Sequence, residues 1–124
     1  MTKVKKIEDT QLLIDVIIDA LQDTKAENIV CIDMRKLSNA ATQFFIICTG
    51  NSNTHVAALG GNVERKVRKE LKDRPWHTEG YRNAEWVLLD YVHVVVHIFQ
   101  KEQREFYNLE GLWADAEITE VKQA

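Results

Sequence analysis

The stretch Trp86-Val-Leu-Leu-Asp-Tyr-Val-His-Val-Val-Val-His-Ile-Phe99 decides the fold, because it contains two runs of β-branched and other apolar residues. These runs cover residues 86–90 and 92–99, and only Tyr91 separates them. They form either one long strand or a hairpin whose tight turn includes the last residues of the first run and the first residues of the second. We favour the antiparallel hairpin.

Side chains of the second run alternate between two sheet faces. One set is purely apolar and is expected to be core: Val92, Val94, Val96 and Ile98. The other set mixes polar and apolar side chains, as expected of an interface: His93, Val95, His97 and Phe99. If helices cover both sheet faces, the second set is core as well, and the sequence leaves both alternatives open.

Two helices and two strands are predicted upstream of the hairpin. Apolar residues recur on one face of residues 9–23, which predicts an amphipathic helix. Residues 28–33 predict a short strand, and residues 44–49 predict a strand that is buried on both faces. After a turn, Ser52 or Asn53 caps a second helix. Its apolar stripe has spacings of three and four: Val56, Leu59, Val63, Val67 and Leu71.

The remaining segments complete the element order. Residues 76–79 predict a short strand before the hairpin, and residues 101–113 return to helical spacing after it. The order α-β-β-α-β-β-β-α predicts an α/β domain of the layered α+β kind, with a mixed sheet of about five strands and flanking helices. We expect one domain over residues 1–113 and a flexible acidic tail over residues 114–124.

The charge balance disfavours one class of function. The 124 residues include 16 Lys and Arg against 19 Asp and Glu, a net charge of −3, whereas freestanding nucleic-acid binders are usually basic. Residues 1–9 lack the apolar run of a signal peptide, and no apolar stretch approaches the roughly 18 residues of a membrane span. Cys31 and Cys48 lie in apolar strands, which favours free thiols in a reducing compartment. We therefore expect a cytoplasmic location, or an organelle matrix if a transit peptide has been lost.

Few groups in the sequence could converge on a catalytic centre. There is neither a Gly-rich phosphate loop nor a dinucleotide-binding fingerprint. Gly50 lies in a turn between a strand and a helix, where nucleotidyltransferases place a Gly-Ser turn, but the paired strand carboxylates that would bind Mg²⁺ are missing. His93 and His97 would lie about 13 Å apart along a strand, too far for one metal ion. We predict no enzyme activity, no cofactor and no metal site.

Two regions of the chain carry opposite charge. Basic residues cluster on the second helix and its end: Arg65, Lys66, Arg68, Lys69, Lys72 and Arg74. They form either a solvated helix face or an auxiliary contact with RNA phosphates. Acidic residues dominate the C-terminal region: Glu102, Glu105, Glu110, Asp115, Glu117 and Glu120. That region suits a basic partner surface.

A series of motifs follows in a characteristic order along residues 9–113. The motifs are Phe45-Ile-Ile-Cys-Thr-Gly-Asn-Ser-Asn-Thr-His55, Glu79-Gly80, Trp86-Val-Leu-Leu-Asp90, Val94-Val-Val-His-Ile-Phe99 and Arg104-Glu-Phe-Tyr-Asn-Leu-Glu-Gly-Leu-Trp113. Each motif alone is weak, but their order and spacing together are specific. In this order the chain resembles the ribosomal silencing factors, also called Iojap-like proteins.

The resemblance implies a fold related to nucleotidyltransferases but without their catalytic carboxylates, and a homodimer when the protein is free. It also implies that the protein binds the fourteenth protein of the large ribosomal subunit on the subunit-joining face. Binding there would prevent association with the small subunit and repress translation. Carried over by position, the partner-binding candidates are Trp86, Tyr91, His97, Arg104 and Tyr107.

Two departures from the family pattern affect the expected contact. Gln43 follows Thr42 where the family usually has Asp, and Val92-His93 replaces a Gly-Asp pair. The loss of two acidic groups would retune binding to a basic partner. Two other functions stay open: a nucleotide-binding relic of a nucleotidyltransferase, and an assembly factor for the large subunit that does not block joining.

Overall fold

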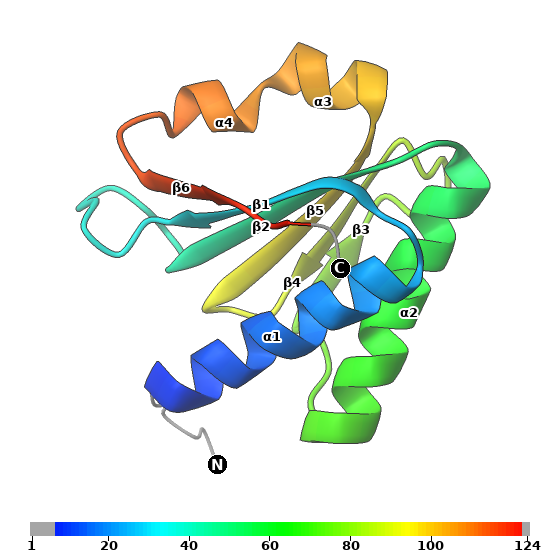
Figure 1. Ribbon diagram of the computed structural model, residues 1–124, viewed down its shortest axis with the longest axis horizontal. Coiled ribbons are helices and arrows are strands. Elements are labelled where there is room, and N and C mark those ends of the chain that lie inside the picture. Colours follow the sequence, from blue (N-terminus) through cyan, green and yellow to red (C-terminus); the bar gives the residue numbers. More distant parts are fainter. Residues whose placement is uncertain (1–6, 123–124) are drawn as a thin grey trace.

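A mixed β-sheet lies between a layer of two long helices and a layer of two short ones (Figure 1). The computed structural model describes residues 7–122. In chain order the elements are α1 (Ile7–Asp23), β1 (Glu27–Asp33), β2 (Phe44–Gly50), α2 (Asn53–Leu71), β3 (His77–Glu79), β4 (Trp86–Asp90), β5 (Val94–Gln100), α3 (Lys101–Tyr107), α4 (Leu109–Leu112) and β6 (Glu117–Glu120). The predicted α/β class is confirmed.

The six strands lie in the order β3-β4-β5-β2-β1-β6. Strands β2 and β5 pair in parallel at the centre, and the other neighbouring strands pair antiparallel. The predicted β4–β5 hairpin is confirmed, with Trp86 opposite Phe99 and Asp90 opposite Val95. Since β2 and β5 run the same way, their carboxyl ends meet at one edge, where α2 and α3 begin. This edge positions the candidate site.

Helices α1 and α2 cover one sheet face with aliphatic side chains. Ser52 caps α2, because its Oγ accepts a hydrogen bond of 3.0 Å from the backbone N–H of His55. The predicted stripe of α2 faces the sheet, and four of its members are fully buried: Val56, Leu59, Val63 and Val67. Gly60 also packs closely, since a Cβ there would meet the Tyr81 hydroxyl at 2.5 Å, whereas a Cβ at Gly61 would meet nothing within 4 Å.

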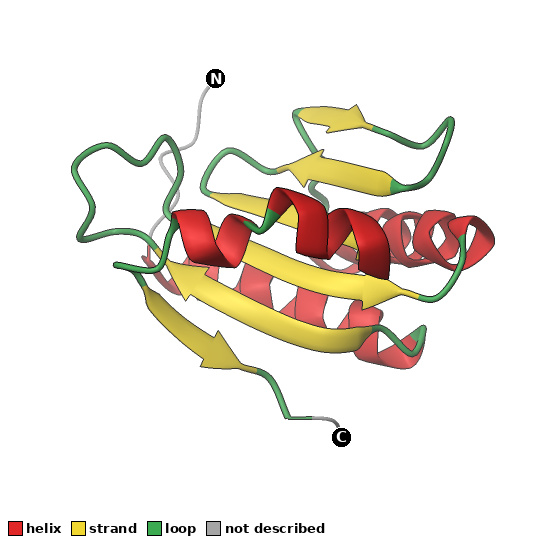
Figure 2. Cartoon of the chain, turned by 90° about the horizontal axis from the view of Figure 1, so that it is seen from above, coloured by secondary structure: helices red, strands yellow, loops and turns green. Residues whose placement is uncertain are grey.

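Helices α3 and α4 lie over the opposite sheet face (Figure 2). That face has its own apolar cluster. Its buried members come from three strands and the loop after β1: Val30, Ile32, Met34, Ile47 and Phe99. Leu109 and Trp113 pack on this cluster from above. Helices therefore cover both faces, and of the two alternatives for the second set of β5 side chains, the core alternative holds for Val95, His97 and Phe99.

The turn between β4 and β5 corrects one expectation. Val92 was predicted to be core, but it is 53% exposed and adopts a φ of 75°. The turn closes over a single residue, with a 3.0 Å bond from the His93 N–H to the Tyr91 carbonyl. Asp90 Oδ1 accepts a further bond of 2.7 Å from the Val92 N–H. A γ-turn with positive φ is rare and strained, above all at a β-branched residue, so the alternation of β5 begins only at Val94.

The C-terminal region corrects a second expectation from the sequence. The flexible tail predicted over residues 114–124 contains β6, which pairs antiparallel with β1 and places Ile118 opposite Ile32. All four residues of β6 are exposed, so the strand has no alternating apolar pattern that would predict it. Its backbone instead satisfies the outer edge of β1. The sheet consequently has six strands and not about five.

Candidate functional site

The candidate site is the short helical layer over the second sheet face. The single helix predicted over residues 101–113 is broken at Asn108, which adopts a left-handed φ of 45°. The Asn108 side chain caps α4 by accepting a bond of 3.2 Å from the Gly111 N–H. Helices of seven and four residues are marginal in water, so α3 and α4 depend on their contacts with the sheet.

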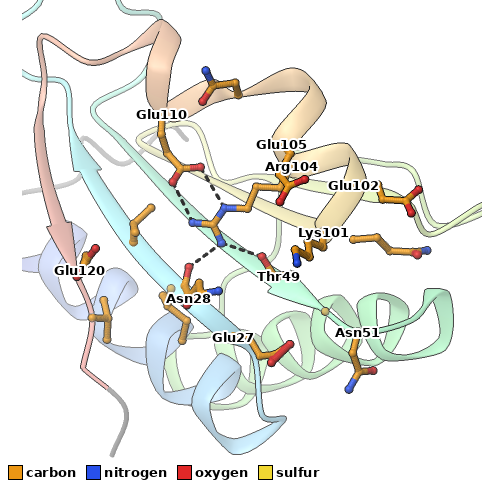
Figure 3. A pocket seen from close by; sticks show the side chains of 16 residues that line it. Glu27, Asn28, Thr49, Asn51, Lys101, Glu102, Arg104, Glu105, Glu110 and Glu120 are labelled. Carbon is orange, nitrogen blue, oxygen red and sulfur yellow. Dashed lines mark hydrogen bonds and ion pairs between the residues drawn. The ribbon is translucent and has the colours of Figure 1, made fainter.

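Arg104 ties this layer to the sheet (Figure 3). Its guanidinium donates two hydrogen bonds, of 3.0 and 3.1 Å, to the carboxylate of Glu110. It also donates to the carbonyl of Asn28 at 2.7 Å and to Thr49 Oγ1 at 2.8 Å. Its side chain is only 12% exposed. This predicted contact residue is therefore engaged within the fold.

Trp86 and Tyr107 lie together at the edge of the same layer. The Trp86 ring contacts Phe99, with centroids 4.8 Å apart, and Tyr107, with centroids 4.7 Å apart, and the Phe99 and Tyr107 rings also lie within 6.5 Å of each other. Tyr107 is 49% exposed, whereas Trp86 is half-buried. The structure thus brings these two predicted contact residues into one surface-reaching aromatic cluster.

His97 lies beneath this cluster and is buried. Its Nδ1 accepts a bond of 3.1 Å from Trp86 Nε1, and the Phe45 ring meets it edge-on at 4.5 Å. Burial lowers the pKa of His97 from 6.5 to about 4, so the ring is neutral near pH 7. His97 thus lies behind Trp86, and its burial leaves little surface for a direct partner contact.

Tyr91 is separated from the other predicted contact residues. It packs in the cluster under α1 and α2 and is 3% exposed. Burial and the neighbouring carboxylate of Glu64 raise the pKa of its hydroxyl. Its position on the opposite side of the sheet removes it from the candidate surface.

Two further side chains are prominent on the short helices. Phe106 is 81% exposed and Leu112 is 71% exposed, beside the half-exposed Tyr107. Sequence spacing places Phe106 on the same helix face as Leu109 and Trp113, which predicts burial. The break at Asn108 separates them, so Phe106 is exposed while Leu109 packs inward. Asn before a short Leu-Glu-Gly-Leu run is the local signal that could have indicated this break.

An acidic groove of about 940 Å³ lies beside this surface, at the carboxyl ends of β2 and β5. Five glutamates line it: Glu27, Glu102, Glu105, Glu110 and Glu120. The cations in its lining are Lys101 and Arg104, and Arg104 is paired with Glu110. The Gly50 turn opens into this groove, where the negative field disfavours the phosphates of a nucleotide.

Two predicted features lie away from this surface. The basic residues of α2 are divided, because Lys66 pairs with Asp19 and Asp23 of α1 while its neighbours are exposed. Both cysteines are free, and burial raises the pKa of Cys31 to about 11 and of Cys48 to about 12. Within residues 7–122, no helix is long and apolar enough to cross a membrane.

Comparison with known proteins decides the family. Residues 7–124 match the family model described as "Ribosomal silencing factor during starvation". The chain belongs to the ribosomal silencing factor family. It is 42% identical over 112 residues to a ribosomal silencing factor of Halalkalibacterium halodurans, which covers 90% of this chain and 94% of that protein. This membership places it in a family of regulators of translation and not in a family named for a reaction.

Other members extend the likeness to organelles and to solved structures. The chloroplastic Iojap protein of Zea mays is 35% identical over 102 residues, covering 82% of this chain and 43% of that protein. A crystal structure of a Chromobacterium violaceum protein is 36% identical, with a TM-score of 0.79 over 92% of this chain and 94% of that one. A Bacillus halodurans structure is 39% identical, with a TM-score of 0.73 over 90% and 98% of the two chains. These structures share the fold and, at this identity, the family.

Proposed function

We propose that this ribosomal silencing factor binds the large ribosomal subunit through its fourteenth protein and sterically blocks joining of the small subunit, which represses translation in the cytoplasm. Membership of the family supports the ribosomal target. The observation that carries the proposal is the exposed apolar surface formed by Phe106, Tyr107 and Leu112, beside an acidic groove. Exposed aromatic and aliphatic side chains of this kind mark protein contact surfaces.

The charge of the surface indicates the chemistry of the partner. The groove is lined by five glutamates, and two of them, Glu102 and Glu105, are exposed on α3 beside Phe106. A partner with basic residues around an apolar patch would complement it, and opposite charge would accelerate encounter at low salt. Of the predicted contact residues, Tyr107 and Trp86 would contact the partner, with Arg104 and His97 holding them in place.

Sedimentation of ribosomal subunits with the full chain tests the proposal. The protein should co-migrate with the large subunit and reduce the fraction of joined subunits. The double variant Phe106→Ala with Leu112→Ala should weaken binding about tenfold or more, since central apolar anchors dominate interface energies. Leu12→Ala is the matched control, because Leu12 is 52% exposed but lies on α1, in the opposite layer.

Two outcomes would contradict the proposal. Unchanged subunit joining together with no co-migration removes the ribosomal target. Co-migration without any effect on joining favours the assembly-factor alternative, and comparing large-subunit maturation in cells with and without the protein would then identify it. A homodimer in the absence of ribosomes is part of the same proposal, and sedimentation equilibrium of the free protein measures it.

A further inference from the structure

A second concave surface lies far from the acidic groove, between the C-terminal half of α2 and the edge strand β3. This hollow has a volume of about 660 Å³, and its lining includes Gly61, Glu64, Arg65, Arg68, Arg74 and Trp76. In Figure 1 the C-terminal end of α2 points away from α3 and α4. The basic hollow and the proposed protein-binding surface are therefore at different ends of the molecule.

The charges of the hollow are strongly unbalanced. Three arginines line it against one carboxylate, Glu64, which accepts a hydrogen bond from the Tyr81 hydroxyl. Within residues 7–122, neither Arg68 nor Arg74 forms an ion pair, and Arg65 bonds only to the amide oxygen of Asn62. Unpaired guanidinium groups that share a concavity favour a ligand with phosphate oxygens.

Trp76 supplies an uncovered flat ring beside these arginines. It is 79% exposed, and its one described ring neighbour is His77, with centroids 6.4 Å apart. Its backbone is fixed, because its N–H donates a 2.7 Å bond to the Asp90 carbonyl at the sheet edge. A large apolar ring held at the surface on a fixed backbone is suited to stacking on a planar ligand.

Gly61 keeps the helix side of the hollow open. A Cβ at this position would meet no atom within 4 Å, so close packing does not require the glycine. Glycine inside a helix destabilises it by roughly 1 kcal/mol relative to alanine, and nothing in the packing compensates for that here. The absence of a side chain leaves room for a ligand between α2 and Trp76.

We propose that this hollow binds an unpaired nucleotide of an RNA strand, with the base stacked on Trp76 and the flanking phosphates bound by Arg68 and Arg74. The combination of an exposed indole with guanidinium groups favours RNA over an acidic peptide, which has phosphate-like charge but no base to stack. A paired base is already stacked on its neighbours and cannot enter a concave site, so the site selects single strands. The assignment rests on the proposed function only in identifying the RNA as ribosomal.

Fluorescence anisotropy of a labelled single-stranded oligoadenylate of about ten nucleotides, titrated with the full chain, tests the site directly. Trp76→Ala should weaken binding about tenfold, the loss of one base stack. Gly61→Leu should weaken it to a similar extent by filling the hollow without any change of charge. Arg68→Gln combined with Arg74→Gln should reduce the slope of log affinity against log salt by about 1.4, for two single-strand phosphate contacts.

Lys69→Gln is the matched control, since Lys69 is an exposed cation on the same helix that does not line the hollow. It should change affinity less than twofold, and circular dichroism should show all variants folded. Three outcomes would each overturn the proposal. Trp76→Ala and Gly61→Leu could both bind RNA like the unaltered chain, a duplex of equal length could bind as tightly as the single strand, or polyglutamate could compete as well as RNA. Leu112→Ala should leave oligonucleotide binding unchanged, so failure of this site is distinguishable from failure of the subunit-joining function.

Discussion

On one face of the sheet α1 and α2 contribute 17 and 19 helical residues, whereas on the other α3 and α4 contribute seven and four. The long helices bury continuous aliphatic stripes. The short-helix layer buries Leu109 of α4 and Trp113, the residue after α4, only in part, and it leaves Phe106 and Leu112 exposed. The first face is thus a conventional helix–sheet core, and the second is anchored by a few side chains.

The difference indicates how stability and binding are divided between the two faces. Long amphipathic helices gain most of their stability from a buried stripe, so the α1–α2 layer should open only with global unfolding. The α3–α4 layer has few buried contacts and should open locally at lower free energy. A surface that must fit a partner benefits from such adjustable anchoring, provided that its anchors persist.

The largest expected effect on the free energy of unfolding comes from the same type of substitution, leucine to alanine, made once on each face. Leu59→Ala, at a fully buried site of α2, should lower the free energy of unfolding by about 3 kcal/mol, since it leaves a cavity under a long helix. Leu109→Ala, at a half-buried site of α4, should lower it by only about 1 kcal/mol. Urea denaturation measures both. Equal losses would contradict the proposed division between a core face and an anchored face.

The second largest effect on the free energy of unfolding is expected from loss of the Arg104 anchor. Arg104→Met removes all four hydrogen bonds of the guanidinium and leaves Glu110 without its partner. We expect a loss of roughly 2 to 3 kcal/mol, discounted for the partial exposure of Glu110. Hydrogen exchange should show faster opening of α3 and α4 with little change in α2. Lys101→Met, an exposed cation at the start of α3, serves as the control.

The pH dependence of the α3–α4 face should follow His97. Its pKa is about 4 in the folded chain and near 6.5 when unfolded, so between these values the unfolded chain binds the proton. Stability should therefore fall as the pH drops from 7 to 5, by about 2 kcal/mol for this group. In His97→Gln that part of the slope should vanish, as measured by urea denaturation at each pH. An equally steep slope in the variant would show that other groups are responsible.

The smallest effect concerns the β4–β5 turn, which belongs to neither helical layer. Val92→Gly relieves a β-branched residue at φ 75° and should raise the free energy of unfolding by about 1 kcal/mol, after the entropy cost of glycine. Val92→Ala should gain less, because alanine keeps its Cβ at the same positive φ. Thermal unfolding measures both, and hydrogen exchange should show the two faces stabilised alike.

The sequence predicted those parts of the fold that strong periodicity specifies. The stripe of α2 and the hairpin follow from spacing and composition, and of the two predicted caps, Ser52 and Asn53, the structure has Ser52. The turn at Val92 was misplaced, because a valine in a left-handed conformation contradicts its local preference. Glycine is the residue that such a turn normally requires, because it adopts a positive φ without steric cost.

The candidate site was predicted less well, because the side-chain alternation of β4 and β5 does not indicate which helices cover each face of the sheet. Trp86 and Tyr107, which come from two different motifs, lie together, whereas Tyr91 lies on the other side of the sheet. Tyr91 continues the alternation of Val87 and Leu89, which pack in the same α1–α2 core, so its ring points to the face opposite Trp86. Phe106 and Leu112 were missed because only the break at Asn108 exposes them.

Strand β6 has a practical consequence for anyone who shortens the chain. Cutting at Trp113, the boundary that the sequence suggests, would strip the outer backbone edge of β1 of its partner. Bare strand edges recruit strands from other molecules, so the shortened protein should self-associate into aggregates even with its helices intact. In the full chain the outermost strand carries Glu117 and Glu120, whose like charges keep two such edges apart. The last strand thus protects the protein's solubility as well as completing its sheet.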